Sequence, residues 1–250
     1  LSISNGFKSG GVNQNPTLNQ INQFFEPEDN FNFDFGWRYI DKKTSISVNT
    51  FYMHRNNIQL NLSNQLEEGN PNSFYFYTAN ASDGYNYGIN IDLNITPNEN
   101  LETYMTIGLL ETMINSYQYM IENTTILVPK REASHAPSYT YSFGFTKYHK
   151  NFYLSGNITG KNKFYFSDSH NKISEAYSIT NIDIGYKISK NIEISVWGKN
   201  IFDKKYSIRG FYFALEPLDL DQNGNPWDDE KLYLMYGESL TFGLTLKYNI

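Results

Sequence analysis

Apolar and polar residues alternate along most of the chain, and this period of two predicts β-strands rather than helices. The pattern is clearest at the C-terminus, where one side of the segment 239–250 carries Leu240, Phe242, Leu244, Leu246, Tyr248 and Ile250. The opposite side carries Ser239, Thr241, Gly243, Thr245, Lys247 and Asn249. Successive side chains of a strand point to opposite faces, so each such segment has one apolar and one polar face.

The alternation predicts ten antiparallel strands, separated by connections of two kinds. The strands cover roughly residues 1–10, 30–40, 44–60, 74–95, 100–117, 133–149, 151–167, 173–188, 191–206 and 234–250. Connections 40–44, 96–100, 149–151 and 189–191 are short, whereas 11–29, 61–73, 118–132 and 207–233 are long. Short turns at one rim and long loops at the other are typical of outer-membrane β-barrels. A membrane sheet has to close, because unpaired strand edges are not tolerated in hydrocarbon.

A soluble β-sandwich or lipocalin-like barrel would show the same alternation with its apolar faces inside. Strand length favours the membrane, since many strands exceed nine residues and can cross about 25 Å of hydrocarbon when tilted. Aromatic residues make up 17% of the chain, and many stand near strand ends, where barrels carry interfacial girdles. We therefore expect the apolar faces to contact lipid and the polar faces to line the interior.

Composition excludes several other classes of protein. A net charge of −6 argues against a nucleic-acid partner, and the absence of cysteine excludes disulfides and thiol sites. Mean hydropathy is −0.54 and no apolar run approaches 18 residues, so no transmembrane helix is expected. The chain shows neither an initiator Met nor a signal peptide. The polarity of the expected interior favours part of a barrel wider than ten strands, because a narrow lumen would need a dense hydrogen-bond network.

Short motifs in a fixed order resemble the TonB-dependent outer-membrane receptors. They are the segments SNGFKSGG at 4–11, FEPE at 25–28 with FGW at 35–37, FYMHR at 51–55, YFSDSHN at 165–171, VWGKNIFDKKY at 196–206, and YGE at 236–238 followed by TFGLTLKY at 241–248. Together they cover the whole chain. The terminal Ile250 departs from the aromatic residue with which the family usually ends.

This resemblance implies that residues 1–250 are the C-terminal portion, about ten strands, of a 22-stranded transmembrane barrel in the Gram-negative outer membrane. The plug domain, the earlier strands and the TonB-binding segment would then lie outside this sequence. It further implies uptake of a scarce nutrient, by default an iron–siderophore complex, driven by the TonB–ExbB–ExbD complex. No catalysis is expected, and the substrate-binding residues are not identifiable. The alternatives are a passive porin or small closed barrel and an omptin-like protease, for which Asp168 and His170 are the candidate pair.

The closing strand also fits the spacing of a barrel-assembly signal. Thr241, Gly243, Leu246 and Tyr248 match the pattern polar-x-Gly-x-x-apolar-x-apolar, in which x is any residue. Recognition by the barrel-assembly machinery would be edge pairing with an exposed strand. The alternation of any last strand that faces lipid gives a similar pattern.

One loop matches a calcium-binding pattern. Residues 219–230 read DLDQNGNPWDDE, so Asp219, Asp221, Asn223, Asn225 and Glu230 supply oxygen ligands for Ca²⁺ in the spacing of an EF-hand loop. No helical periodicity flanks the loop, and Pro226 lies inside it, so the alternative is a solvated acidic loop. No other cofactor is expected.

Aromatic segments near the long loops are candidate contacts for a siderophore or a sugar. They are Phe24-Phe25, Phe74-Tyr75-Phe76-Tyr77 and Phe211-Tyr212-Phe213. Basic residues on polar faces or loops, which include Lys8, Arg38, Lys161, Lys199 and Arg209, are candidates for steering an anionic chelate. A girdle and loop-packing role for the aromatic residues, and ion pairing for the basic ones, remain open.

Overall fold

The computed structural model describes residues 1–16, 18–65, 74–121, 124–168, 171–212 and 232–248. Over this part of the chain, ten strands form one antiparallel sheet. In spatial order they are β1 (Ser2–Lys8), β4 (Glu28–Ile40), β5 (Thr44–Asn56), β8 (Gly84–Asn98), β9 (Leu101–Ile114), β12 (Tyr139–His149), β13 (Phe152–Lys161), β16 (Tyr177–Lys187), β17 (Ile192–Lys199) and β20 (Thr241–Tyr248). Spatial order follows chain order, as in an up-and-down barrel wall. None of the described helices is long and apolar enough to cross a membrane.

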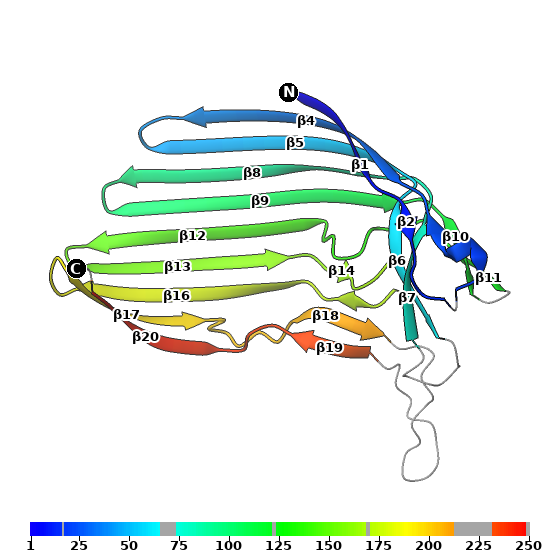
Figure 1. Cartoon of the computed structure of the whole chain (residues 1–250). Helices are drawn as coiled ribbons and strands as arrows, with labels where there is room; N and C mark the ends of the chain where they lie inside the picture. Colours follow the sequence, from blue (N-terminus) through cyan, green and yellow to red (C-terminus); the bar gives the residue numbers. More distant parts are fainter. Residues whose placement is uncertain (17, 66–73, 122–123, 169–170, 213–231, 249–250) are drawn as a thin grey trace, which may run out of the picture.

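Five further hairpins collect at one rim of this sheet (Figure 1). They pair β2 (Gly11–Val12) with β3 (Phe24–Phe25), β6 (Gln59–Gln65) with β7 (Phe74–Asn80), β10 (Tyr117–Ile121) with β11 (Thr124–Val128), β14 (Phe164–Tyr165) with β15 (Ile173–Ser174), and β18 (Ser207–Tyr212) with β19 (Leu232–Tyr236). Among the described residues, the opposite rim carries only short turns. The predicted alternation of long and short connections is therefore confirmed.

Several predicted strands are wrong in extent. Segments predicted as continuous over 44–60, 74–95, 151–167, 173–188 and 234–250 are each divided between a wall strand and a rim hairpin, and 191–206 ends its strand at Lys199. Asn57 breaks the first of them with φ 59°, and Asn200, with φ 47°, directly follows the end of β17 at Lys199. A residue in the left-handed region cannot continue a strand, and Asn tolerates that region better than most residues. Residues 61–73 and 118–132, predicted as loops, contain parts of the rim hairpins.

The tight turn between β4 and β5 is held by one carboxylate. Asp41 Oδ1 accepts hydrogen bonds from the backbone N–H groups of Lys43 and Thr44, both at 2.7 Å. This is the local bonding that makes Asp a turn residue. The N–H of Lys43 is the largest cause of a lowered pKa of Asp41, because it stabilises the charged carboxylate. The carboxylate therefore stays ionised and keeps the turn short at neutral pH.

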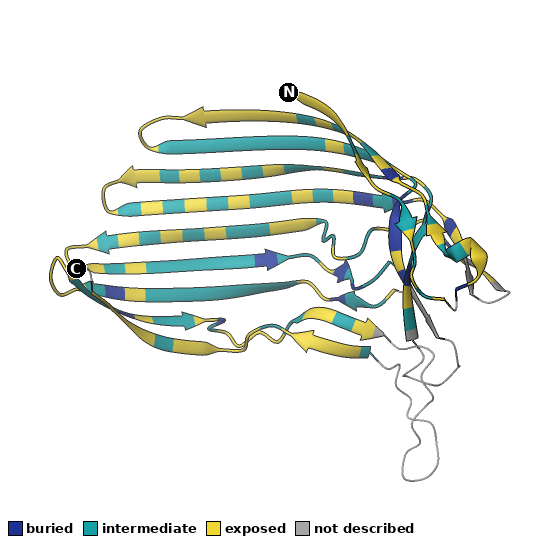
Figure 2. Cartoon of the chain, viewed as in Figure 1, coloured by how far each residue is buried: buried dark blue, intermediate teal, exposed yellow. Residues whose placement is uncertain are grey.

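The register aligns the alternating apolar residues of the ten strands on one face, although some aromatic side chains, such as Phe51 and Trp197, lie on the other. Val48, Ile91 and Ile107 lie side by side across β5, β8 and β9, whereas Asn49, Asn90 and Gly108 form the matching row on the other face. On β20, Phe242 is 79% exposed and Leu244 is 66% exposed. Buried side chains instead concentrate toward the rim hairpins (Figure 2). The apolar face is therefore a surface and not the interior of a soluble sandwich, as expected for a wall that contacts lipid.

Glycines on the polar face leave room for aromatic rings of the neighbouring strand. Gly185 lies opposite Tyr153, Gly144 opposite Tyr104 and Gly243 opposite Trp197. A Cβ atom at any of these glycines would overlap the facing ring. The three pairs therefore fix large side chains flat against the inner wall.

We expect Gly185→Val to lower the free energy of unfolding by about 1–3 kcal/mol, because Tyr153 has to leave its position. Gly36→Val is the matched control, since its Cβ would meet only Asn49 Oδ1, at an ordinary contact of 3.6 Å. Urea unfolding of the full-length protein in detergent micelles measures both. Equal losses for the two variants would contradict the packing role of the Gly185–Tyr153 pair.

Candidate functional site

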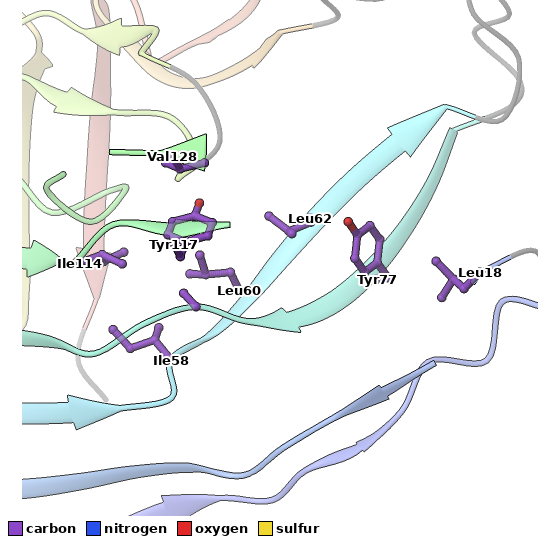
Figure 3. Close-up of a cluster of buried hydrophobic side chains, with 9 residues drawn as sticks. Leu18, Ile58, Leu60, Leu62, Tyr77, Ile114, Tyr117 and Val128 are labelled. Carbon is purple, nitrogen blue, oxygen red and sulfur yellow. The ribbon is translucent and has the colours of Figure 1, made fainter. Parts of the chain in front are cut away.

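A cluster of buried apolar side chains holds the hairpins at the rim (Figure 3). Its members are Leu18, Ile58, Leu60, Leu62, Tyr77, Ala81, Ile114, Tyr117 and Val128. Hairpins β6–β7 and β10–β11 contribute most of them, and Ile114 comes from the end of wall strand β9. Burial of this apolar surface stabilises the hairpins against one another and against the wall. This part of the rim is a packed layer of strands and not a set of separate loops.

A buried ion pair ties hairpin β6–β7 to the first strands of the wall. Glu28 is 6% exposed, and its Oε1 lies 2.6 Å from Arg55 Nη2. The second oxygen, Oε2, accepts a hydrogen bond from the backbone N–H of Gln59 at 2.8 Å. The side-chain amide of Gln59 donates to the carbonyl oxygens of Glu26 (2.9 Å) and Ser9 (3.0 Å). The buried carboxylate of Glu28 is thus both paired with a charge and further hydrogen-bonded, the condition under which a buried charge is tolerated.

Two asparagines attach hairpin β2–β3 to β7. The side chain of Asn13 donates to the carbonyl of Thr78 and accepts from its N–H, both at 2.8 Å. Asn80 bonds Glu26 in the same reciprocal way, at 3.0 and 2.7 Å. A side-chain amide that pairs with both backbone groups imitates a strand neighbour. These contacts hold the exposed aromatic ring of Phe24, 63% exposed, at the surface of the rim.

The other half of the rim, around hairpins β14–β15 and β18–β19, places cationic side chains on aromatic rings. The Arg131 guanidinium lies 4.8 Å from the centre of the Tyr165 ring, and the Lys205 ammonium lies 4.4 Å from that of Tyr236. Arg131 Nη2 also donates to the Ser167 carbonyl at 2.9 Å. The attraction of a cation to a ring face orients each charge. The rim therefore presents fixed positive charge beside aromatic surface.

His135 lies within this half, 5.3 Å from the Phe164 ring centre, with φ 53°. Partial burial, and next the positive charge of Arg209, lower the pKa of His135. Both causes favour the neutral imidazole at pH 7. We therefore expect the positive charge of this half of the rim to come from Arg and Lys.

Asn200 fastens the two ends of hairpin β18–β19 to the wall. Its side chain donates to the carbonyls of Lys204 (3.0 Å) and Glu238 (2.9 Å) and accepts from the N–H of Lys204 (2.9 Å). Its backbone N–H donates to Asn181 Oδ1 at 2.9 Å, and the residue is 2% exposed. Asp203 adds a bond from the N–H of Leu240 at 2.8 Å. These contacts explain the physical role of Asn and Asp in the segment 196–206.

The predicted calcium ligands lie outside the described residues, since Asp219, Asp221, Asn223, Asn225 and Glu230 all fall within 213–231. Calcium binding there stays a prediction. In the described part of the chain, no group of three or more His, Asp or Glu side chains is arranged to hold a metal ion.

The predicted pair for the protease alternative is described only at Asp168, because residues 169–170 are not described. Asp168 Oδ1 accepts a hydrogen bond from the backbone N–H of Ser134 at 2.6 Å, and its carbonyl accepts from the Tyr117 hydroxyl at 3.3 Å. Both contacts join the rim loops. These bonds give Asp168 a structural role, and the protease alternative gains no support.

The aromatic and basic candidates divide between packing and exposure. Tyr77 is buried in the rim cluster, whereas Phe76 is 74% and Phe211 is 49% exposed. Among the basic candidates, Lys161 and Arg209 lie in or beside rim elements, and Arg38 lies near the opposite rim. The Lys199 ammonium is 3.8 Å from a Glu238 carboxylate oxygen, and both side chains are exposed.

All four candidate assembly-signal residues, Thr241, Gly243, Leu246 and Tyr248, lie in β20, a strand at one edge of the ten-stranded sheet. Leu246 and Tyr248 are on the apolar face and Thr241 and Gly243 on the polar face. Gly243 makes room for Trp197, whose Nε1 donates to the Thr245 hydroxyl at 3.0 Å. The assembly role stays a prediction.

Sequence reasoning missed the Glu28–Arg55–Gln59 network, the Arg131–Tyr165 and Lys205–Tyr236 pairs and the Asn13 and Asn80 bonds. The residues of each group lie far apart in the sequence or in segments predicted as loops. A charged residue at the first position of a strand, such as Glu28, was the one available signal.

A family model described as TonB dependent receptor-like, beta-barrel, matches residues 1–201, four fifths of the chain. The chain belongs to the TonB-dependent receptor family. The lipid-contacting wall described above accordingly lies in the Gram-negative outer membrane. The rim hairpins are then on the extracellular side and the short turns on the periplasmic side.

Solved receptors share the fold over nearly the whole chain. The ferric yersiniabactin uptake receptor FyuA from Yersinia pestis aligns with a TM-score of 0.73 at 16% identity, over 98% of this chain and 34% of that one. The siderophore receptor PiuA from Acinetobacter baumannii gives 0.69 at 13% identity, over 98% and 33%, and the copper transporter OprC gives 0.66 at 12%, over 98% and 36%. The chain thus spans about a third of the length of these proteins. No curated protein sequence matches it.

Proposed function

We propose that this TonB-dependent receptor takes up a scarce nutrient across the outer membrane, and that the nutrient is an anionic ferric chelate of the siderophore class. The chain would form the C-terminal strands of the barrel, with a plug domain and the TonB-binding segment elsewhere in the protein. Energy would come from the TonB–ExbB–ExbD complex. The cargo passes through the protein as a ligand, and no chemical step at the rim is needed.

The observation that carries this proposal is the extracellular rim, where packed hairpins hold cations on aromatic rings. Arg131 over Tyr165 and Lys205 over Tyr236 combine positive charge with flat apolar surface. An anionic chelate with planar organic groups is attracted by the first property and packs against the second. Several solved neighbours are siderophore receptors by name, which supports the same cargo, whereas the copper transporter supports a metal cargo without a siderophore.

The proposal is tested in a strain that lacks the gene for the full-length receptor. We expect the deletion to slow growth under iron limitation when ferric siderophores are supplied as the iron source, and the gene carried on a plasmid to restore it. Copper limitation is run in parallel. A growth defect seen only under copper limitation would indicate that the cargo is copper and not a siderophore. Unchanged growth with every ferric chelate would contradict the proposal.

Replacing Lys205 by Met is expected to weaken binding of the ferric chelate that supports growth about fivefold, because about 1 kcal/mol of charge attraction at an exposed site is lost. Met keeps the length of the side chain. Lys190→Met, at the periplasmic rim, is the matched control with the same change of net charge. Intrinsic fluorescence quenching of the purified full-length receptor measures the Kd. Equal affinities for Lys205→Met and Lys190→Met would show that Lys205 does not contribute to binding of the chelate.

A further inference from the structure

Two nitrogen-bearing side chains meet on one aromatic ring at the extracellular mouth of the wall. Lys161 ends β13, and its register partner Thr140 places it on the polar face, toward the interior. The ammonium of Lys161 lies 4.1 Å from the centre of the Phe164 ring, and the imidazole of His135 lies 5.3 Å from the same centre. The Phe164 ring is 2% exposed, so it forms a covered apolar floor beneath these groups.

Arg209 of hairpin β18–β19 joins this cluster. Phe166 lies edge-on to Phe164, with 5.8 Å between the ring centres, and it would collide with a Cβ atom at Gly210. The close packing at Gly210 keeps the adjacent Arg209 near enough for its charge to act on His135. Arg209 and His135 are both exposed, so their polar atoms are accessible to a ligand.

The backbone fixes His135 in this position. Its φ is 53°, and its N–H donates to the Tyr165 carbonyl at 2.9 Å. A left-handed conformation is unfavourable for a residue with a Cβ atom, and such conformations concentrate at functional sites. The bond to Tyr165 therefore holds an exposed imidazole beside Lys161 at a cost in backbone energy.

The cluster has little compensating negative charge. In the described part of the chain, neither Lys161 nor Arg209 forms an ion pair. Asp168, whose charge also acts on His135, already accepts a backbone N–H at 2.6 Å. Burial is the largest cause that lowers the pKa of His135, and the charge of Arg209 comes next. Lys161 acts in the same direction, whereas the Phe166 backbone and Asp168 act against it. His135 is therefore neutral at pH 7 and becomes charged as the medium turns acidic.

We propose that His135, Lys161 and Arg209 form an anion-binding site in which His135 makes the affinity for the cargo depend on pH. This rests on the proposed function, because the anion would be the negatively charged part of the ferric chelate. Lys161 and Arg209 attract that charge at pH 7, and protonated His135 adds a third positive charge. Since the bound anion stabilises the protonated imidazole, the chelate binds more tightly as the pH falls. A neutral chelate gains nothing from the same protonation.

The test measures the Kd of the purified full-length receptor by intrinsic fluorescence quenching, from pH 8 to pH 5.5 in half-unit steps. The probes are a ferric tricatecholate with three negative charges and a neutral ferric trihydroxamate. We expect the tricatecholate to bind about threefold to fivefold more tightly at pH 5.5, the effect of one added cation at an exposed site, and the trihydroxamate to show no such gain. His135→Asn should abolish the gain, since Asn tolerates the left-handed conformation but carries no charge. His149→Asn, at the periplasmic rim, is the matched control.

Arg209→Met distinguishes this site from a general effect of charge. It should weaken binding of the tricatecholate at pH 8 about fivefold, because one cation is lost. It should also move the midpoint of the pH response upward, because the positive neighbour that disfavours protonated His135 is gone. A purely structural role of Arg209 would leave the midpoint in place. Lys190→Met, at the periplasmic rim, carries the same change of net charge and should leave it in place as well.

A permanent charge at position 135 gives the converse result. His135→Lys should bind the tricatecholate at pH 8 as tightly as the parent binds it at pH 5.5. Failure of the tricatecholate to bind, or an equal pH response in the parent and His135→Asn, would overturn this inference. If ferric chelates still support growth through the receptor, the proposed function survives that result. Growth that is independent of the receptor would overturn both.

Discussion

Replacement of Asn200 by Leu is expected to lower the free energy of unfolding of the full-length receptor by about 3–5 kcal/mol. The change removes three side-chain hydrogen bonds at a site that is 2% exposed. Each buried backbone group left without a partner costs about 1–3 kcal/mol. Leu also has to adopt φ 47°, a conformation that costs a non-glycine residue about 1–2 kcal/mol.

Two further substitutions at this position separate the two causes. Asn200→Gly loses the same hydrogen bonds but accepts the left-handed conformation, so it should be less destabilising than Leu. Asn200→Asp keeps the acceptor for the N–H of Lys204, but it turns a buried carboxylate oxygen toward the carbonyls of Lys204 and Glu238, so it should be clearly less stable than the parent. Urea midpoints in detergent micelles give the order, which we expect to be Asn, then Gly, then Leu, with Asp well below Asn. An equal midpoint for Leu and the parent would mean that Asn200 does not fasten the hairpin.

The wall was predictable from the sequence because its cause is local. A residue that contacts lipid and its neighbour that faces the interior need opposite polarity, and the period of two records that need at every position. The row of Val48, Ile91 and Ile107 therefore follows directly from the alternation in each strand. Short turns such as the one at Asp41 were equally visible, since their chemistry is confined to a few residues.

The rim was less predictable because its cause is not local. Asn57 interrupts the predicted strand 44–60 and Asn200 directly follows the end of β17, both in left-handed backbone conformations, and the alternation pattern carries no information on φ. Glu28 is stabilised by Arg55 and by the N–H of Gln59, which are distant in the sequence. Aromatic residues of the hairpins divide into buried Tyr77 and exposed Phe76, although both belong to one apolar stretch. Tertiary contacts decide each of these outcomes.

The last prediction concerns which face of the wall contacts lipid. Ile91 lies at the middle of β8 between Val48 and Ile107 on the apolar face, and the adjacent Asn90 lies between Asn49 and Gly108 on the polar face. Ile91→Arg places a charge near the centre of the hydrocarbon, which costs about 2–4 kcal/mol in a barrel wall. Asn90→Arg places the same charge toward the interior, where we expect a change within about 0.5 kcal/mol.

The two variants change adjacent positions and each adds one arginine, so the added charge and its position along the strand are matched. Resistance of the folded receptor to unfolding by SDS on heating, followed by gel mobility, gives the comparison, and urea unfolding gives its size. We expect Ile91→Arg to lose heat resistance at a lower temperature than the parent and Asn90→Arg to retain it. Successive residues of a strand face opposite sides, so a difference between these two variants reports the environment of each face and not a general weakening of β8. The reverse order would place the hydrocarbon on the Asn90 side of the wall.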